Sequence, residues 1–186
     1  MLSLLLQEEV MKLYVARHGE TAWNVQKKVC GRTDIPLTET GMEQAKLLAE
    51  KAVDLDIDII IASPMIRAQQ TAGAVSEKIG IPVLTDARII EHDFGIYEGV
   101  NWYNPGFLAN KQHFACSYPG GESLMDVAHR VYGFLDELKE KYPNKNILVV
   151  CHNGVCRVLR SYFDDVTNED FFKFSQENAS FKEYEL

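Results

Sequence analysis

The sequence has no long hydrophobic run and no excess of positive charge. Its 19 Lys and Arg residues stand against 27 Asp and Glu residues, which gives a formal net charge of −8. Binding to a nucleic-acid backbone draws on clustered positive charge, and a membrane span needs about 20 mostly apolar residues in a row. We therefore expect neither a nucleic-acid nor a membrane partner, and an anionic ligand would need a local basic pocket in an acidic surface.

Cysteine is also scarce. The chain has four cysteines, and none forms a C-x-x-C pair with another: Cys30, Cys116, Cys151 and Cys156. Without a secretory signal, this usage favours reduced thiols and a cytoplasmic location. Residues 1–10 hold a short apolar run with neither a basic flank nor a small-residue cleavage site, so we expect an extension or a misassigned start without function there.

Length and composition favour one domain. The 186 residues are enough for one well-packed core and short for two, so we expect a single domain over residues 1–186. A hydrophobic content of 46% with 25% charged residues is usual for a soluble globular protein. No internal repeat, low-complexity tract or linker interrupts the chain, and the sequence does not define an oligomeric state.

Apolar runs and helical periodicities alternate along the chain. Runs typical of buried strands lie at 13–16, 59–62 and 147–150, with shorter strands expected at 81–84, an edge position because of its proline, and at 179–184. Helical spacing predicts helices at about 38–53, 64–79, 123–142, 155–163 and 169–174. This alternation predicts an α/β fold, a three-layer α/β/α sandwich with a mostly parallel central sheet.

Cap residues mark the predicted helix starts. Thr40 and Glu43 have the spacing of a capping box in the first helix. Ser63 is expected to cap the second helix, with the following proline in its first helical position. Ser123 and Asp126 predict a capped start for the third helix.

Charged and imidazole side chains follow three of the predicted strands. Arg17, His18 and Gly19 come directly after the first predicted strand. His152 comes shortly after the strand predicted at 147–150. Arg67 lies in the first turns of the helix after the second strand, where free backbone N–H groups also favour an anion. Ligands of open α/β sheets bind beyond the carboxyl ends of the strands, so we expect these side chains to meet at one rim.

The segment from about 87 to 122 lacks a clear periodicity and is rich in aromatic residues. Seven of them lie between residues 94 and 118, and Glu91 precedes them in a loop flanked by glycines. Such a segment is typical of a lid or substrate-pocket wall, and a satellite cluster that pins a long loop is an equal alternative. The aromatic content leads us to expect a preference for substrates with some apolar surface.

Two arginines, two histidines and a carboxylate at one rim suit phosphoryl transfer through a histidine. Guanidinium groups match the geometry of phosphate oxygens, and phosphoryl transfer depends mostly on positioning and charge stabilisation. A neutral imidazole can attack phosphorus near pH 7, while a protonated acid supplies the proton that the leaving oxygen needs.

The same residues belong to a series of motifs in chain order. They are Arg17-His18-Gly19-Glu20-Thr21 with Trp23-Asn24, Gly31-x-x-Asp34-x-Pro36-Leu37-Thr38, Ser63-Pro64-x-x-Arg67-Ala68-x-x-Thr71-Ala72, Glu91-x-x-Phe94-Gly95-x-x-Glu98-Gly99, Gly121-Glu122-Ser123 and His152-Asn153-Gly154. Together they resemble the histidine phosphatase superfamily in its phosphoglycerate mutase-like branch. The resemblance extends from about Met11 to the final strand.

The resemblance implies a role for each matched residue. His18 would be the nucleophile that becomes phosphohistidine, and Glu91 would protonate the leaving group and later help to activate water. The remaining matched positions would bind the substrate or its phosphoryl group: Arg17, Asn24, Gly31, Arg67, His152 and Asn153. The resemblance implies no metal and no cofactor, because cationic side chains do the work of a magnesium ion, and the expected partner is a small-molecule phosphomonoester.

The chain also departs from the family pattern. Asn153 stands where a second glycine often follows the histidine, and Tyr97 stands where tryptophan is frequent. The segment between Glu98 and Gly121 is much shorter than in the glycolytic mutases, where a longer insertion helps to enclose the bisphosphate cofactor. A more open site lets water reach a phosphoenzyme, so we expect a phosphatase, with phosphoglycerate mutase-type transfer as the alternative.

Residues 151–157 carry a rival phosphatase pattern. Cys151 and Arg157 have the C-x5-R spacing of cysteine phosphatases, between a predicted strand and a predicted helix that would activate a thiolate. Val158 replaces the hydroxyl residue usual after that arginine, and this interpretation leaves the blocks around His18 and Arg67 without a role. We therefore favour the histidine nucleophile.

The sequence leaves three alternatives open, which concern the identity of the acid, a metal site and a protein that binds without catalysis. Asp93 and Glu98 are rival acids to Glu91. A cluster of potential metal ligands fits no common zinc spacing: Cys151, His152, Cys156 and His92. A catalytically weak phospho-ligand binding module would be expected to lack the nucleophile or the acid, and this chain has candidates for both.

Overall fold

A five-stranded sheet lies at the centre of the computed structural model, which describes residues 11–186. The strands are β1 (Lys12–Arg17), β2 (Ile59–Ala62), β3 (Val83–Thr85), β4 (Ile147–Cys151) and β5 (Phe181–Glu185). Their order is β3-β2-β4-β1-β5, and all neighbours pair in parallel except β1 with β5. The predicted α/β fold with a mostly parallel sheet is confirmed. The extension expected at residues 1–10 lies outside the described residues.

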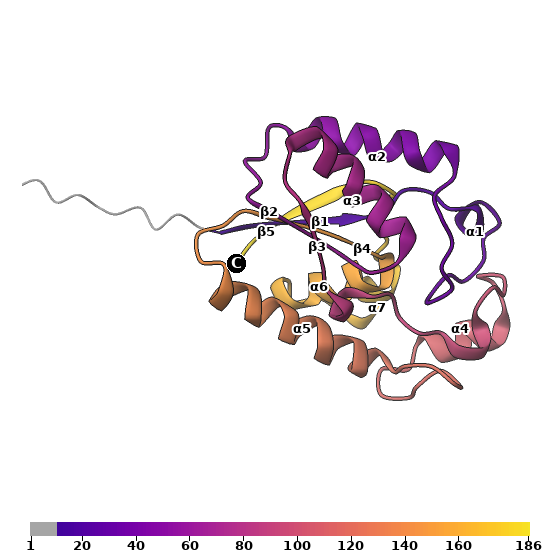
Figure 1. Ribbon diagram of the computed structural model, residues 1–186. Coiled ribbons are helices and arrows are strands. Elements are labelled where there is room, and N and C mark those ends of the chain that lie inside the picture. The colour runs from indigo at the N-terminus through magenta and orange to yellow at the C-terminus, as the bar shows by residue number, and fades with distance from the viewer. Residues whose placement is uncertain (1–10) are drawn as a thin grey trace, which may run out of the picture.

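Helices cover both faces of this sheet (Figure 1). The principal helices are α2 (Glu39–Ala52), α3 (Ile66–Ile79), α5 (Leu124–Lys141) and α6 (Asn153–Phe163). Alternate residues of the central strands point to opposite faces: Tyr14 and Leu148 pack with α2 and α3, while Leu13 and Val149 pack with α5 and α6. Burial on both faces explains why these strands read as continuous apolar runs.

Two of the predicted helix caps are wrong. Thr38 rather than Thr40 caps α2, because its side chain accepts from the backbone N–H of Gly41. Ser63 does not cap α3, which begins at Ile66 after Met65. The hydroxyl of Ser63 instead lies 2.7 Å from a ring nitrogen of His152. The capping box at Ser123 is present as predicted.

The strand bounds differ slightly from the expected ones. β3 begins at Val83 rather than at residue 81, and it lies at the sheet edge as expected. β5 begins at Phe181 rather than at Ala179, whose positive φ of 49° belongs to the turn before the strand.

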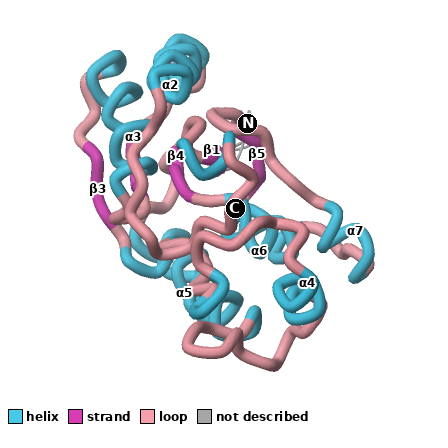
Figure 2. Tube along the Cα trace, turned by 90° about the vertical axis from the view of Figure 1, so that its right-hand side faces the viewer, coloured by secondary structure: helices cyan, strands magenta, loops and turns pink. Residues whose placement is uncertain are grey.

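Short helices lie between the main elements. They are α1 (Ala22–Val25), α4 (Pro105–Lys111) and α7 (Asn168–Lys173), with two 3-10 turns at Ala87–Ile89 and Gly95–Tyr97. α4 falls in the segment whose sequence predicts no helix, and Asn104 caps it directly before Pro105. Figure 2 shows α4 on the same side of the sheet as α5 and α6. Within residues 11–186, no helix is both long and apolar enough to cross a bilayer.

Candidate active site

The carboxyl ends of β1 and β4 bring two histidines together. Parallel pairing aligns Arg17 with Cys151, and the backbone N–H of His18 donates to the carbonyl of Cys151 at 3.0 Å. His152 follows Cys151, so the two imidazoles leave neighbouring strands at the same level. Their ring centroids are 5.3 Å apart.

His18 is held as a neutral imidazole with a defined tautomer. Its Nδ1 lies 2.7 Å from the carbonyl oxygen of Gly19, which can only accept, so Nδ1 carries the proton and Nε2 keeps its lone pair. Burial, and then the charges of Arg67 and Arg17, hold the pKa of His18 well below its ordinary value. The side chain is only 4% exposed, yet it lines the cavity described below.

His152 is engaged through both ring nitrogens. Nε of Arg67 donates to Nδ1 of His152 at 3.2 Å, so the proton of the neutral ring lies on Nε2 and faces the Ser63 hydroxyl. Burial, and then the charge of Arg67, keep the pKa of His152 well below its ordinary value. His152 is fully buried and stands behind His18 rather than on the cavity wall.

Arg67 is also fully buried, and the loop after Cys30 holds its guanidinium group. Nη1 donates to the carbonyl of Thr33 at 3.0 Å, and Nη2 donates to the carbonyl of Gly31 at 2.7 Å. With the bond to His152, three of its five N–H groups have protein acceptors. Gly31 therefore orients Arg67 and is not part of the cavity lining.

The carboxylate of Glu98 organises that same loop. It accepts from the backbone N–H groups of Gly31, Arg32 and Thr33 at 3.0–3.3 Å, and from the Thr33 hydroxyl at 2.8 Å. The Glu98 carboxylate is therefore engaged by this loop, and Glu98 is not part of the cavity lining.

Arg17 and Asn24 line the cavity next to His18. Nη1 of Arg17 donates to the carbonyl of Gln176 at 2.6 Å, and its Nε is buried without a hydrogen-bond partner among the described residues. Asn24 uses its Oδ1 to accept from the backbone N–H and the hydroxyl of Thr21. Its amide nitrogen donates no hydrogen bond to another described residue.

Glu91 reaches the cavity from the loop segment and meets the start of α6. Its carboxylate accepts from the backbone N–H of His92 at 2.9 Å and of Gly154 at 3.1 Å. A side chain at Gly154 would meet this carboxylate, since a Cβ there would lie 2.5 Å from Oε1. Glu91 lines the cavity, whereas the rival acid Asp93 points to Gly95 and Arg32 and does not.

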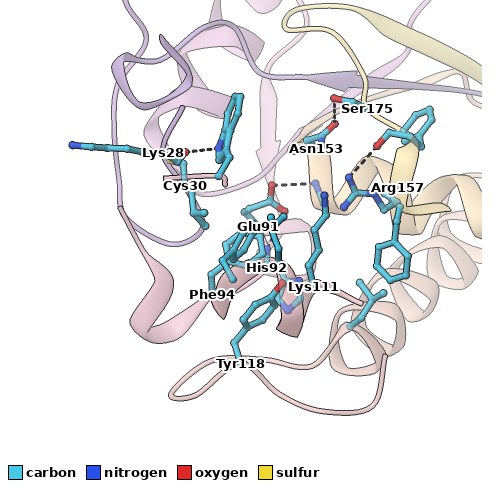
Figure 3. Close-up of a pocket in the computed structure, with 18 of the residues that line it drawn as sticks. Lys28, Cys30, Glu91, His92, Phe94, Lys111, Tyr118, Asn153, Arg157 and Ser175 are labelled. Carbon is cyan, nitrogen blue, oxygen red and sulfur yellow. Dashed lines mark hydrogen bonds between the residues drawn. The ribbon is translucent and has the colours of Figure 1, made fainter. Parts of the chain in front are cut away.

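A cavity of about 360 Å³ opens in front of His18 (Figure 3). Arg17, His18, Glu91 and Asn153 lie on its lining. Aromatic side chains form much of the remaining wall: Phe94, Trp102, Tyr103, Phe107, Tyr118, Phe172 and Phe174. The volume suits a small molecule with one polar end and an apolar body.

Four lysine and arginine residues on this wall have no catalytic or binding role in the sequence-based interpretation. They are Lys28, Lys111, Arg157 and Lys173. In the sequence, Arg157 stands out only as part of the cysteine phosphatase pattern, and its place one turn after the His152-Asn153-Gly154 motif is the signal that could have identified it. Lys111 ends α4, a helix that the periodicity did not predict.

Cys151 is poorly placed for the rival chemistry. It is fully buried, is not part of the cavity lining, and its sulfur lies 3.6 Å from that of Cys156. Burial, and then the contact with Cys156, raise the pKa of the Cys151 thiol well above its ordinary value, which opposes formation of a nucleophilic thiolate. Over residues 11–186, no three His, Cys, Asp or Glu side chains group closely enough to hold a metal ion.

Comparison with known families gives one match over most of the chain. Residues 13–186 match the family model described as the histidine phosphatase superfamily (branch 1). This match covers all the motifs noted in the sequence.

Individual proteins of this kind are similar to the chain. The uncharacterized phosphatase PhoE of Bacillus subtilis (strain 168) is 37% identical over 145 residues, covering 78% of this chain and 73% of that protein. The probable phosphoglycerate mutase GpmB of Yersinia pestis (strain Pestoides F) is 31% identical over 159 residues, covering 82% and 74%. Among solved structures, the mycobacterial glucosyl-3-phosphoglycerate phosphatase Rv2419c with VO3 has a TM-score of 0.85 at 28% identity, covering 93% and 92%.

The buried neutral histidines predict a loss of stability in mild acid. Burial lowers the pKa of His18, His152 and His92, so between pH 6.5 and 5 the unfolded chain binds protons that the folded chain does not. The free energy of unfolding should fall with decreasing pH, by up to about 1.4 kcal/mol per pH unit for each histidine. Urea unfolding at pH 7.0, 6.0 and 5.0 measures this slope.

His18→Asn should reduce the dependence of the unfolding free energy on pH by the contribution of one histidine. His129→Gln, which removes an exposed imidazole from α5, is the matched control. An unfolding free energy that stays constant from pH 7 to pH 5 would contradict the neutral assignment.

Proposed function

The chain belongs to the histidine phosphatase superfamily, and on that premise we propose that it hydrolyses small phosphomonoesters through a phosphohistidine on His18. One observation carries this proposal: a neutral His18, with its proton fixed on Nδ1, lines the same cavity as the Glu91 carboxyl group. His18 can supply a lone pair to phosphorus, and the Glu91 carboxyl group can supply a proton to the departing oxygen.

In the first step, Nε2 of His18 forms a bond to phosphorus while the bond from phosphorus to the ester oxygen breaks. Protonated Glu91 gives its proton to that oxygen, and the alcohol leaves. Arg17 and the amide group of Asn24 line the cavity beside His18, where they can donate to the phosphoryl oxygens. The carbonyl of Gly19 stabilises the positive charge that develops on the ring, through its bond with Nδ1.

Arg67 and His152 support the same step from behind His18. Arg67 has two N–H groups beyond its three hydrogen bonds to protein acceptors. The Nε2–H group of His152 can exchange the Ser63 hydroxyl for a phosphoryl oxygen as its hydrogen-bond acceptor. Until substrate binds, the positive charge of Arg67 helps to keep His18 neutral and therefore nucleophilic.

In the second step, water attacks phosphorus and the bond to Nε2 breaks. Glu91 is now a carboxylate and accepts the proton that the water loses, so the enzyme returns to its starting state. The short segment between residues 98 and 121 favours water over a second alcohol as the acceptor, because less of the chain encloses the phosphoenzyme. This preference distinguishes the proposed phosphatase from a mutase.

A binding module without catalysis is the alternative from another class. The presence of both a neutral imidazole and a carboxyl group on one cavity favours the enzyme. The aromatic wall supports substrates that carry some apolar surface, with the segment at 87–122 as a wall of the substrate pocket.

Replacement of the nucleophile should abolish turnover. In His18→Ala, kcat for 4-nitrophenyl phosphate should fall by about 10³-fold or more, because no other group replaces the covalent step. Cys151→Ser is the matched control and should keep most of the wild-type kcat, since Cys151 is outside the cavity lining. The opposite pattern, with an inactive Cys151→Ser and an active His18→Ala, would favour the cysteine phosphatase mechanism.

Replacement of the acid should depend on the leaving group. In Glu91→Gln, kcat for an alkyl phosphate should fall by about 100-fold or more, with a smaller fall for 4-nitrophenyl phosphate, whose oxygen needs less protonation. Steady-state rates on both substrates measure this difference.

The rival carboxylates serve as controls for that experiment. Asp93→Asn should keep most of kcat on both substrates, because Asp93 is not part of the cavity lining. Glu98→Gln should lower stability by about 1–3 kcal/mol, since its carboxylate accepts four hydrogen bonds from residues 31–33. Equal losses on both substrates in Glu91→Gln would contradict its role as proton donor.

A further inference from the structure

Two cations on the cavity wall have no part in the mechanism above. Lys111 ends α4 and Arg157 lies on α6, and both line the cavity that contains His18 and Glu91. Figure 3 shows both side chains extending into the region next to Glu91. They come from segments far apart in the sequence, and the fold brings them to the same wall.

The two cations are poorly neutralised by the protein. Among the residues that the structure describes, the Lys111 ammonium group has no hydrogen-bond acceptor and no ion-pair partner. Burial, and then the positive charge of Arg157, lower the pKa of Lys111, so the Lys111 ammonium group is destabilised by repulsion from Arg157. An anion between them would remove that repulsion and supply the missing acceptors.

Arg157 is anchored so that its charge faces the cavity. One Nη2–H donates to the carbonyl of Phe174 at 3.0 Å, and the guanidinium carbon lies 5.9 Å from the centroid of the Phe171 ring. Its Nε is buried and has no hydrogen-bond partner among residues 11–186. An arginine fixed by one bond, with an unused buried donor, is suited to bind planar anionic oxygens.

The other two lysines on the wall lie differently. Lys173 forms an ion pair with Glu169, one turn away on α7. Lys28 forms no ion pair among the described residues, but Figure 3 shows its side chain on the far side of Glu91 from Arg157 and extending away from that region. Its ammonium nitrogen lies 5.9 Å from the ring centroid of Trp23. Of the lysine and arginine side chains labelled there, Lys111 and Arg157 are therefore the two that extend together into the region next to Glu91.

Their position relative to Glu91 identifies which part of a substrate they would meet. Figure 3 shows both side chains beside Glu91, and the Glu91 carboxylate is the strongest of the charges that oppose the lowering of the Arg157 pKa by burial. In the proposed function, Glu91 protonates the ester oxygen of the leaving alcohol. A group beside Glu91 is therefore placed to contact the leaving alcohol.

We propose that Lys111 and Arg157 form a second anion-binding site, which selects phosphomonoesters whose alcohol carries a carboxylate or a second phosphate. This inference rests on the proposed function, because it takes the place of the leaving alcohol from it. The aromatic wall packs against the body of that alcohol, and the two cations hold its anionic end. The preferred substrate is then anionic at both ends and apolar between them.

The test compares substrates that differ only in this charge. 3-Carboxyphenyl phosphate and its neutral isostere, 3-carbamoylphenyl phosphate, are assayed with the wild-type chain and with Arg157→Gln and Lys111→Gln. 1,3-Phenylene bisphosphate forms a second arm that separates selection of a phosphate from selection of a carboxylate. Glutamine at position 157 keeps a donor for the Phe174 carbonyl while removing the charge.

The measured quantity is the ratio of kcat/KM for each anionic substrate to that for the neutral one. We expect the ratio to be lower in each variant than in the wild type by about tenfold or more, as for loss of a charge-assisted hydrogen bond. Intrinsic reactivities cancel when ratios are compared between variants. Matched controls are Arg160→Gln, an α6 arginine paired with Asp164, and Lys141→Gln, in the last turn of α5; both should keep the wild-type ratio.

A binding measurement separates failure of this site from failure of the proposed function. Calorimetry with His18→Ala gives the Kd for both phenyl phosphates without turnover, and Arg157→Gln in that background should remove the preference for the carboxylate. If this kcat/KM ratio is the same in the wild type, Arg157→Gln and Lys111→Gln for both anionic substrates, the second anion-binding site is overturned even if His18 is the nucleophile. A kcat/KM ratio that falls as far in Arg160→Gln as in the two charge variants would also overturn it.

Discussion

The parallel pairing of β1 with β4 is the constraint on which the site depends. Its register places Arg17 opposite Cys151, so the residues that follow the two strands leave the sheet side by side. The hydrogen bond from His18 N–H to the Cys151 carbonyl extends this pairing by one residue into the site. A shift of one residue in either strand would turn a histidine toward the opposite face. The chemistry thus depends on two strands that are buried on both faces.

The site concentrates cations around imidazoles that must remain neutral. Burial lowers the pKa of His18, and the charges of Arg67 and Arg17 lower it further. The same charges can bind a phosphoryl group, so the features that keep the nucleophile neutral also attract its substrate. Because Gly19 fixes the proton on Nδ1, only Nε2 is free to attack phosphorus. Backbone acceptors and buried charge therefore determine the reactivity of His18.

The sequence predicts the site residues that lie at the carboxyl ends of strands. An apolar run followed by Arg17 and His18 identifies both the strand and the residues at its end, because parallel strands place ligands at their carboxyl ends. The structure brings these residues close to His152, Arg67 and Glu91, and their chemical roles are proposals. The role of Ser63 was predicted wrongly, since cap propensity does not reveal that its hydroxyl meets His152.

The cavity wall was less predictable for a different physical reason. Lys111 and Arg157 come to one cavity wall only through the tertiary fold, because α4 and α6 are far apart in the sequence and no local pattern specifies where they lie. The Asn104-Pro105 pair is a helix-start signal that could have located α4, but its short length leaves little periodicity. Glu98 shows the converse, because its motif suggests chemistry while its hydrogen bonds make it an organiser of residues 31–33.

Trapping the covalent intermediate tests the histidine mechanism most directly. Acid-sensitive phosphohistidine is preserved by rapid quenching in alkali after mixing with excess phosphomonoester, and peptide mass spectrometry with ³¹P NMR then locates the phosphoryl group. It should lie on Nε2 of His18, because Nδ1 is bound to the Gly19 carbonyl. A phosphoryl group on Cys151, or on Nδ1 of His18, would contradict the proposed mechanism.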